Sequence, residues 1–155
     1  MKIAVIGSTG RAGSRIITEA RQRGHEVTGI SRHEEKGLRK SLWDLTQNDL
    51  KDFEVVVSAF ATWEEQSLHL KAVKHLDNIM KNLESRWIAV GGAGSLFVAE
   101  GLRLKDSEGF PAEYKAVADG MAEGLTYLES KAVSNWSYFS PSAIFEPGAR
   151  TGRYR

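Results

Sequence analysis

The chain has 155 residues, of which 41% are hydrophobic and 26% are charged, and its formal net charge is +1. These proportions are typical of one globular domain, and the small net charge gives no electrostatic case for a nucleic-acid or membrane partner. Cysteine is absent, which excludes disulfides, thiolate nucleophiles and cysteine-metal sites. Because the chain starts on a strand pattern and has no membrane-length apolar run, we expect a cytoplasmic protein.

The first thirteen residues form the most informative pattern. The apolar run 3–6 leads into the glycine-rich sequence GSTGRAG and then into helix-like sequence. Gly7 would allow the tight turn, Gly10 would let backbone approach a phosphate, and Gly13 would let the helix pack on the strand. The free N–H groups and positive dipole end of such a helix favour a pyrophosphate. The predicted cofactor contacts in this turn are Gly7, Ser8, Thr9, Gly10, Arg11, Ala12 and Gly13.

Two alternatives apply to this turn. The glycines would also suit a tight strand-to-helix connection that binds nothing. The hydroxyl groups of Ser8 and Thr9 would either bond a phosphate or cap the helix, and both roles are compatible.

Strand and helix patterns alternate along the rest of the chain, as a parallel sheet with crossover helices requires. Strand patterns occupy residues 26–31, 42–44, 55–60, 87–90 and 136–140. Helical patterns follow the glycine turn as far as Gly24 and recur over 46–50, 63–83 and 114–128, with loops expected over 33–40 and from Ser95 to Pro111. We therefore predict a single α/β domain over residues 1–155, of the Rossmann type, doubly wound, with a mostly parallel sheet and helices on both faces.

Four segments resemble atypical short-chain dehydrogenase/reductases: GSTGRAG at 7–13, Asp44, VGGAGSL at 90–96 and FSPSAIFEPGARTGRYR at 139–155. The chain is similar in particular to the NmrA-like, NADH-flavin reductase branch, whose members bind NAD(P) on a Rossmann fold. The resemblance implies that Asp44 bonds the adenine amino group and that Pro141 contacts the nicotinamide amide. Members of the group generally continue past the last motif, so we expect the C-terminal part of this domain to be incomplete.

The residues after the second strand bear on the choice of cofactor. Arg32 follows this strand directly, where the adenosine ribose would lie. A carboxylate at this place favours NAD, whereas arginine favours the 2′-phosphate of NADP. Arg11 is a second cation within reach of phosphate, although both arginines would also suit a solvated surface. We expect NADP(H) to be favoured over NAD(H).

Further cofactor contacts are predicted at other strand ends. Ser58, Ala59 and Phe60 would line the ribose and diphosphate, and Gly91 and Gly92 would make room near the nicotinamide. Small residues at these positions would also serve packing alone. Asp44, too, has a second interpretation, as a cap or turn residue for the helical turn 46–50.

The sequence indicates catalytic residues less clearly than it indicates cofactor contacts. The tyrosine-dependent branch of the superfamily uses Tyr-x-x-x-Lys, but here Tyr114 precedes Lys115 and Ala118. Neighbouring residues point about 100° apart on a helix, so this pair cannot work in that way, and we interpret Tyr114 as a core residue. Ser95 is a weak catalytic candidate that would also simply begin the next segment. The four histidines are scattered, and no metal site is predicted.

These observations predict a reductase that passes hydride from NADPH to a flat acceptor, a flavin or a quinone, without a Tyr-x-x-x-Lys triad. The alternative is a nonenzymatic module that senses NADP(H) and reports to a partner protein. A third and weaker option is an epimerase- or dehydratase-like enzyme. The expected partner is a small-molecule electron acceptor, with neither nucleic acid nor membrane, and the sequence does not indicate an oligomeric state.

Overall fold

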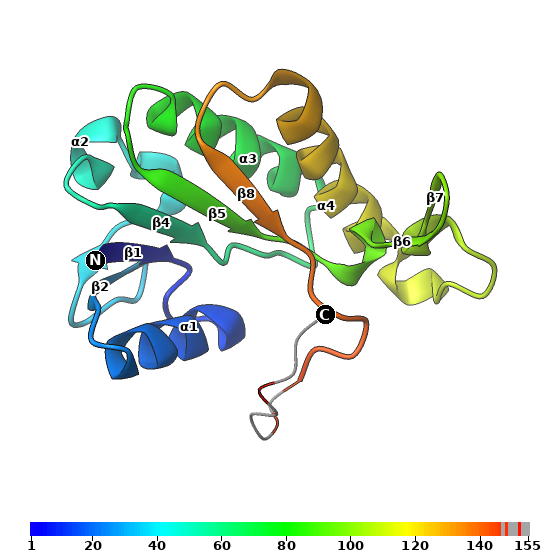
Figure 1. Ribbon diagram of the computed structural model, residues 1–155, viewed down its shortest axis with the longest axis horizontal. Helices are drawn as coiled ribbons and strands as arrows, with labels where there is room; N and C mark the ends of the chain where they lie inside the picture. Colours follow the sequence, from blue (N-terminus) through cyan, green and yellow to red (C-terminus); the bar gives the residue numbers. More distant parts are fainter. Residues whose placement is uncertain (147, 149–151, 153–155) are drawn as a thin grey trace.

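The computed structural model describes residues 1–146, 148 and 152 (Figure 1). The strands of its main sheet are β1 (Lys2–Ile6), β2 (Glu26–Ser31), β3 (Leu38–Arg39), β4 (Val55–Ser58), β5 (Arg86–Val90) and β8 (Trp136–Phe139). All neighbouring pairs are parallel, and the spatial order is β3-β2-β1-β4-β5-β8. The order therefore reverses between β1 and β4, which is the switch point of a doubly wound sheet.

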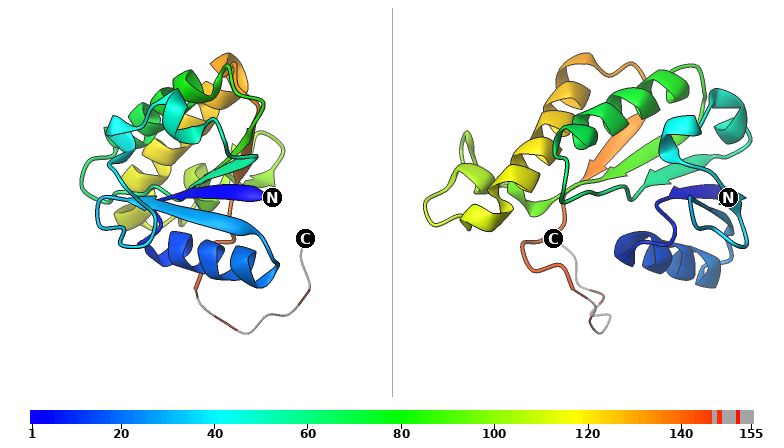
Figure 2. Two further views of the ribbon diagram at one scale, coloured as in Figure 1. Left: turned by 90° about the vertical axis from the view of Figure 1, so that its left-hand side faces the viewer. Right: turned by 180° about the vertical axis from the view of Figure 1, so that it is seen from behind.

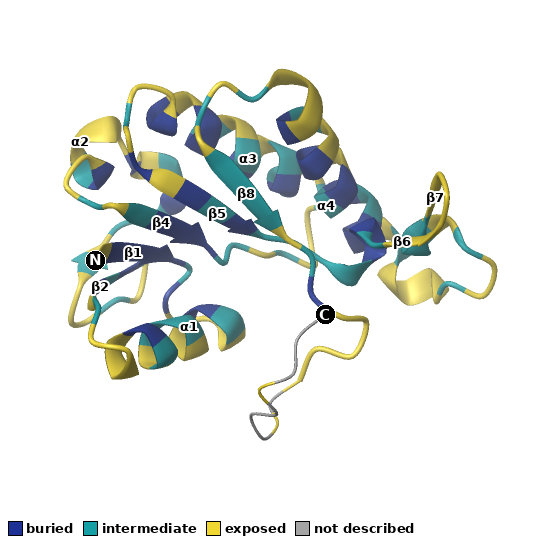
Figure 3. Cartoon of the chain, viewed as in Figure 1, coloured by how far each residue is buried: buried dark blue, intermediate teal, exposed yellow. Residues whose placement is uncertain are grey.

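Helices cover both faces of this sheet. In both views of Figure 2, α1 (Arg11–Gln22) lies on one face, and α3 (Ser67–Met80) and α4 (Ala112–Lys131) lie on the other. The strand β1 alternates between the two layers, because Ala4 and Ile6 join the core under α3 and α4 while Ile3 and Val5 join the core under α1. The four residues are all buried, as Figure 3 shows for this strand. The predicted Rossmann-type fold is confirmed.

Several local predictions are also confirmed. The bounds of β2 are those predicted. Gly24 follows α1 with a positive φ of 79°, and its N–H donates to the carbonyl of Arg21 at 2.9 Å. The short helix α2 (Gln47–Leu50) begins after Thr46, which forms a reciprocal capping box with Asp49. None of the described helices is both long enough and apolar enough to cross a membrane.

The third strand does not lie where the sequence predicted it. Residues Leu42–Asp44 form a 3₁₀ turn, η1, because the Ser41 hydroxyl accepts a hydrogen bond from the Trp43 N–H at 3.3 Å. The strand β3 comes earlier, inside the expected loop, and pairs Leu38 with Ile30 of β2. The prediction of a strand at 42–44 was therefore wrong.

The segment between β5 and α4 is also more ordered than expected. It contains the 3₁₀ turns η2 (Ala93–Ser95) and η3 (Leu104–Asp106). Between them β6 (Phe97–Ala99) and β7 (Leu102–Arg103) form an antiparallel hairpin, which extends beside the N-terminal end of α4 (Figure 1). The prediction of a plain loop from Ser95 to Pro111 was wrong, since the pairing of two such short strands leaves little pattern in the sequence.

A buried carboxylate fixes the connection from α4 to β8. Asp77 of α3 is only 2% exposed. It accepts hydrogen bonds from the Tyr127 hydroxyl at 2.9 Å, from the Val133 N–H at 3.1 Å and from both the N–H and the hydroxyl of Ser134, at 3.0 and 2.5 Å. Because these donors come from α4 and from the loop that follows it, one side chain holds α3, α4 and the start of β8 together.

Replacing this carboxylate is expected to destabilise the fold. Asp77→Ala leaves the part-buried N–H groups of Val133 and Ser134 and two hydroxyl groups without their acceptor, and we expect the free energy of unfolding to fall by about 3 kcal/mol. Tyr127→Phe removes one bond only and should cost about 1 kcal/mol. Urea denaturation of both variants measures the difference, and equal losses would show that the backbone donors do not depend on Asp77.

Candidate functional site

The turn between β1 and α1 requires glycine at two of its three glycine positions. Gly7 has a positive φ of 78°, and a Cβ there would lie 2.9 Å from the carbonyl oxygen of Ala59. A Cβ at Gly13 would lie 2.1 Å from the carbonyl oxygen of Gly7. A Cβ at Gly10 would meet only that same oxygen, at 3.2 Å. A tight connection alone therefore explains Gly7 and Gly13, but it explains Gly10 poorly.

The first turn of α1 presents backbone donors at the switch point. Gly10 is the N-cap residue, with no side-chain cap on the helix, and its carbonyl accepts from the Ser14 N–H at 3.0 Å. Within the described part of the chain, the N–H groups of Arg11, Ala12 and Gly13 donate to no acceptor. Three free donors at the positive end of a helix dipole make an anion-binding site.

The hydroxyl groups of Ser8 and Thr9 do not cap α1. The Ser8 hydroxyl donates to the carboxylate of Glu34, and the Thr9 hydroxyl donates to the hydroxyl of Ser31 at 3.3 Å. The bond from Ser8 lowers the pKa of Glu34, which therefore carries a negative charge at neutral pH. The capping alternative is wrong, and both side chains instead tie the glycine turn to the end of β2.

Cations gather near this end of β2. Arg32 and Arg11 are exposed, and neither guanidinium has a partner among the described residues. A third cation, Arg39 of β3, donates from Nε to the carbonyl of Arg32 at 3.1 Å. The sequence did not point to Arg39, because the pairing of Ser31 with Arg39 depends on a strand of two residues. The expected basic site for a 2′-phosphate thus has one more member.

Asp44 lies at the end of η1 with an exposed side chain. Its carboxylate has no partner within the described residues, whereas Asp49 supplies the cap of α2. The interpretation of Asp44 as the cap of that helical turn was wrong. Its predicted bond to an adenine amino group stays a prediction.

The end of β4 lies against the glycine turn. The Ala59 N–H donates to the carbonyl of Ile6 at 2.9 Å, and the Ala59 carbonyl lies directly beside Gly7. Ser58 is buried, and Phe60 packs edge-on against Trp43, with ring centroids 5.7 Å apart. The fold therefore brings these residues to the switch point, while their contact with a cofactor remains a prediction.

The space beside each of the two glycines after β5 is taken by a side chain of the same protein. A Cβ at Gly91 would lie 2.0 Å from the Tyr138 ring, and one at Gly92 would lie 2.8 Å from the sulfur of Met121. Burial raises the pKa of Tyr138 to about 12, so this phenol stays neutral. Packing explains both glycines, and the predicted approach of Gly91 and Gly92 to a nicotinamide now rests only on their place at the end of β5.

Ser95 is buried and makes its hydrogen bonds inside the protein. Its hydroxyl donates to the carbonyl of Gly92 at 2.8 Å and lies 2.7 Å from the hydroxyl of Ser140. Ser95 thereby joins the segment after β5 to the segment after β8, where Pro141 is also buried. This arrangement favours a structural role for Ser95 over a catalytic one.

Tyr114 is not a core residue, contrary to our interpretation. It is 47% exposed. It lies in the first turn of α4, one turn before Ala118, whose Cβ lies 2.8 Å from where a Cβ of Gly94 would be. The apolar stripe of this helix starts only at Val117, because the preceding turn extends beyond the sheet edge.

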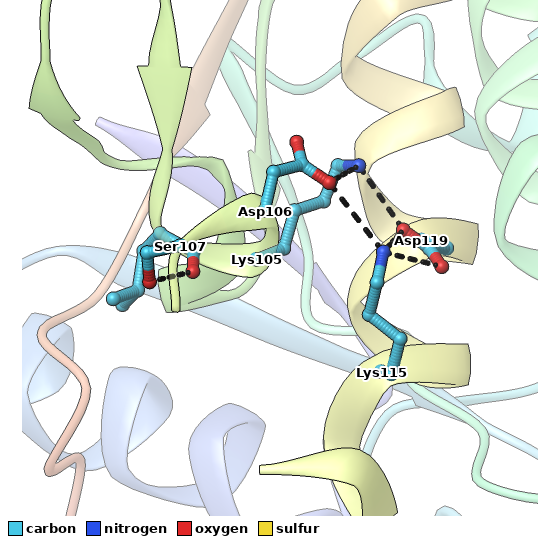
Figure 4. A network of polar contacts seen from close by, with 6 residues as sticks. Lys105, Asp106, Ser107, Lys115 and Asp119 are labelled. Carbon is cyan, nitrogen blue, oxygen red and sulfur yellow. Dashed lines mark hydrogen bonds and ion pairs between the residues drawn. The ribbon is translucent and has the colours of Figure 1, made fainter. Parts of the chain in front are cut away.

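Lys115 has carboxylate partners of its own. Its ammonium lies 2.6 Å from Asp119 and 3.5 Å from Asp106, and Lys105 bonds the same two carboxylates (Figure 4). Hydrogen bonds within this cluster raise the pKa of Lys105 and lower the pKa of Asp106 and of Asp119, so these three groups stay charged. Lys115 therefore does not serve the Tyr114 phenol. Among the described residues no three His, Asp or Glu side chains are grouped to hold a metal ion.

A strand, glycine turn and helix at the switch point of a parallel sheet in this order define a dinucleotide-binding Rossmann protein. The model of the NAD dependent epimerase/dehydratase family matches residues 3–94, and the chain belongs to this family. The match covers the glycine turn and the sheet as far as β5, and it ends before Tyr114 and α4.

Several similar proteins are known. The uncharacterized protein YwnB of Bacillus subtilis is 42% identical over all of this chain and 78% of its own length. A Streptococcus pneumoniae protein, described as a putative NADH-flavin reductase, has a TM-score of 0.92 and 41% identity, over 98% of this chain and 77% of its own. A putative epimerase from Bacteroides thetaiotaomicron has a TM-score of 0.83 and 35% identity, over 99% and 76%. The predicted resemblance to NAD(P)-binding proteins of the NADH-flavin reductase type is thereby confirmed, whereas the NmrA-like assignment stays a prediction. The described residues include only part of its last segment, since 147, 149–151 and 153–155 lie outside them.

Substitutions at Gly13 and Gly10 distinguish the glycine that the fold needs from the glycine that cofactor binding needs. Gly13→Ala places a methyl group against a backbone carbonyl, and we expect it to cost about 2 kcal/mol or more of unfolding free energy. Gly10→Ala should cost less than about 1 kcal/mol but weaken NADPH binding at least tenfold, because its methyl group would crowd a phosphate bound at the predicted site. Denaturation curves and cofactor titration measure the two effects. Wild-type affinity in Gly10→Ala would show that no phosphate approaches this residue.

Proposed function

We propose that the protein is an NADPH-dependent reductase that passes hydride to a flat acceptor of the flavin or quinone class. The observation that carries the proposal is an anion site at the switch point together with the internal engagement of two candidate acid–base groups, Lys115 and Ser95, among the described residues. Three free N–H groups of α1 face the switch point. On the other side, Lys115 is bound to Asp119 and the Ser95 hydroxyl is bound to Gly92 and Ser140.

The residues at the switch point fit a nicotinamide dinucleotide. The N–H groups of Arg11, Ala12 and Gly13 would hold the pyrophosphate, and Gly10 leaves room for it. The free guanidinium groups of Arg11 and Arg32, with Arg39 beside them, would hold a 2′-phosphate. Asp44 would bond the adenine, and the segment after β5 and Pro141 would border the nicotinamide.

When bound, the reduced nicotinamide supplies a hydride, so that NADPH, one proton and a quinone or flavin give NADP⁺ and the reduced acceptor. Such an acceptor takes its proton from solvent, and the chain then needs no general acid. Its own task is to hold two flat groups in contact and to exclude water. The description of the Streptococcus pneumoniae protein as an NADH-flavin reductase supports this class of reaction.

A second candidate is a nonenzymatic sensor of NADP(H). The enclosed Ser95 hydroxyl and the engaged Lys115 favour it, because neither group is free to act as an acid or a base. A sensor would bind the cofactor tightly without turnover, and its partner affinity would differ between the reduced and oxidised forms. An epimerase- or dehydratase-like activity fits less well because it relies on an acid–base group, although the Bacteroides thetaiotaomicron protein is described as a putative epimerase.

Binding and turnover are tested together. NADPH and NADH are titrated against the protein by tryptophan quenching, and FMN or menadione is then added while cofactor absorbance is followed. We expect NADPH to bind more tightly and to be oxidised. Binding without oxidation by any acceptor would favour the sensor, and binding of neither cofactor would contradict both proposals.

The choice of NADPH depends on Arg32 in this proposal. Arg32→Gln removes one charge-assisted contact, so the dissociation constant for NADPH should rise about tenfold while that for NADH changes less than about twofold. Arg86→Gln is the matched control, because Arg86 is exposed at the opposite end of the sheet. Equal losses for both cofactors would show that Arg32 does not recognise the 2′-phosphate.

A further inference from the structure

Two exposed aromatic rings meet at the carboxyl edge of the sheet. Trp63, in the loop after β4, is 59% exposed, and Tyr114 is 47% exposed. Their ring centroids are 6.0 Å apart and their planes are inclined by 65°. In this edge-to-face arrangement each ring keeps a face that its partner does not cover, and flat molecules stack on such faces.

The fold positions this pair firmly. The loop 59–66 passes from the tip of β4 toward the start of α4 (Figure 1), and the His69 ring fixes it through a 3.0 Å bond to the carbonyl of Thr62. Gly120 of α4 packs against the backbone of Gln66. The contacts of Lys105 and Lys115 with Asp106 and Asp119 hold η3 against the same end of α4 (Figure 4). The loop 59–66 and the start of α4, which carry the two rings, are thus fixed in place, close to where the nicotinamide is proposed to bind.

The surroundings of the two rings are negatively charged. Glu64 and Glu65 follow Trp63 directly, Glu113 precedes Tyr114, and all three are exposed. None of them forms an ion pair with another described residue. Lys115, next to Tyr114 in the sequence, and Lys105 are balanced by Asp106 and Asp119. A phosphate-bearing ligand is therefore repelled here, whereas an uncharged ring is not.

We propose that Trp63 and Tyr114 form the platform for the acceptor, and that Glu64, Glu65 and Glu113 restrict it to uncharged flat rings, such as quinones and riboflavin, rather than flavin nucleotides. This inference rests on the proposed reductase function and narrows the acceptors named there to those without a phosphate. Stacking on the two rings would bind the acceptor, and the three carboxylates would repel an acceptor that carries a phosphate.

Direct binding tests the platform without any turnover. Menadione, riboflavin and FMN are titrated against the protein, with and without NADP⁺, by tryptophan fluorescence. Riboflavin and FMN share one ring system and differ by a phosphate, so we expect riboflavin to bind about tenfold more tightly at low salt. The quenching assigned to Trp63 should be absent in Trp63→Phe. In the variant with Glu64→Gln, Glu65→Gln and Glu113→Gln, the preference should fall below about twofold.

Kinetics supply the second measurement. Trp63→Ala and Tyr114→Ala should raise the KM for menadione about tenfold with an unchanged dissociation constant for NADPH. Tyr114→Phe keeps the ring and should behave like the wild type. Val133→Ala, at the far end of α4, is the control. A loss of kcat in Tyr114→Phe would assign the phenol to proton transfer and overturn the platform role.

The two proposals fail in different ways. Ring binding at Trp63 without any NADPH oxidation would contradict the reductase function and leave the platform standing. Turnover of menadione with unchanged KM in Trp63→Ala and Tyr114→Ala would contradict the platform alone. FMN binding as tight as that of riboflavin would overturn the charge restriction.

Discussion

The direct contact between Gly13 and the carbonyl of Gly7 is the constraint on which the site depends. No side chain fits between them, so the first turn of α1 lies immediately on the end of β1. Since β1 pairs with both β2 and β4, this turn comes to the point where the strand order reverses. The free N–H groups of α1, the end of β2 and the end of β4 therefore meet at one place, although they come from separate parts of the chain.

The two faces of the sheet are covered by different means. The layer of α1 relies on apolar strands and backbone contacts, with Ile3, Val5 and Val27 in its core. The layer of α3 and α4 contains a buried carboxyl group, that of Asp77, which gathers donors from α4 and the following loop. A buried carboxylate with this many donors fixes one arrangement of the helices, and α4 in turn carries Tyr114 to the sheet edge.

Local patterns predicted the first half well and the chemistry end poorly. The strand–turn–helix unit and β2 are encoded by neighbouring residues, and both were found. The strand β3 was misplaced because two residues, Leu38 and Arg39, are held by pairing with β2 rather than by their own pattern. Arg39 was missed for the same reason. Tyr114 was misread because helical periodicity identifies a stripe but not where the helix passes the edge of the sheet. The Glu34–Ser8 contact joins residues 26 positions apart and left no local signal.

Two side chains of the glycine turn are already engaged, since Ser8 is bonded to Glu34 and Thr9 to Ser31. Apart from the guanidinium of Arg11, the turn therefore offers a phosphate only its main-chain N–H groups. In the proposed NADPH complex, the side chains that would distinguish one dinucleotide from another lie mainly in the short segment after β2, where Arg32 is exposed. Cofactor preference would then evolve largely separately from cofactor affinity, because the two properties would reside in different stretches of sequence.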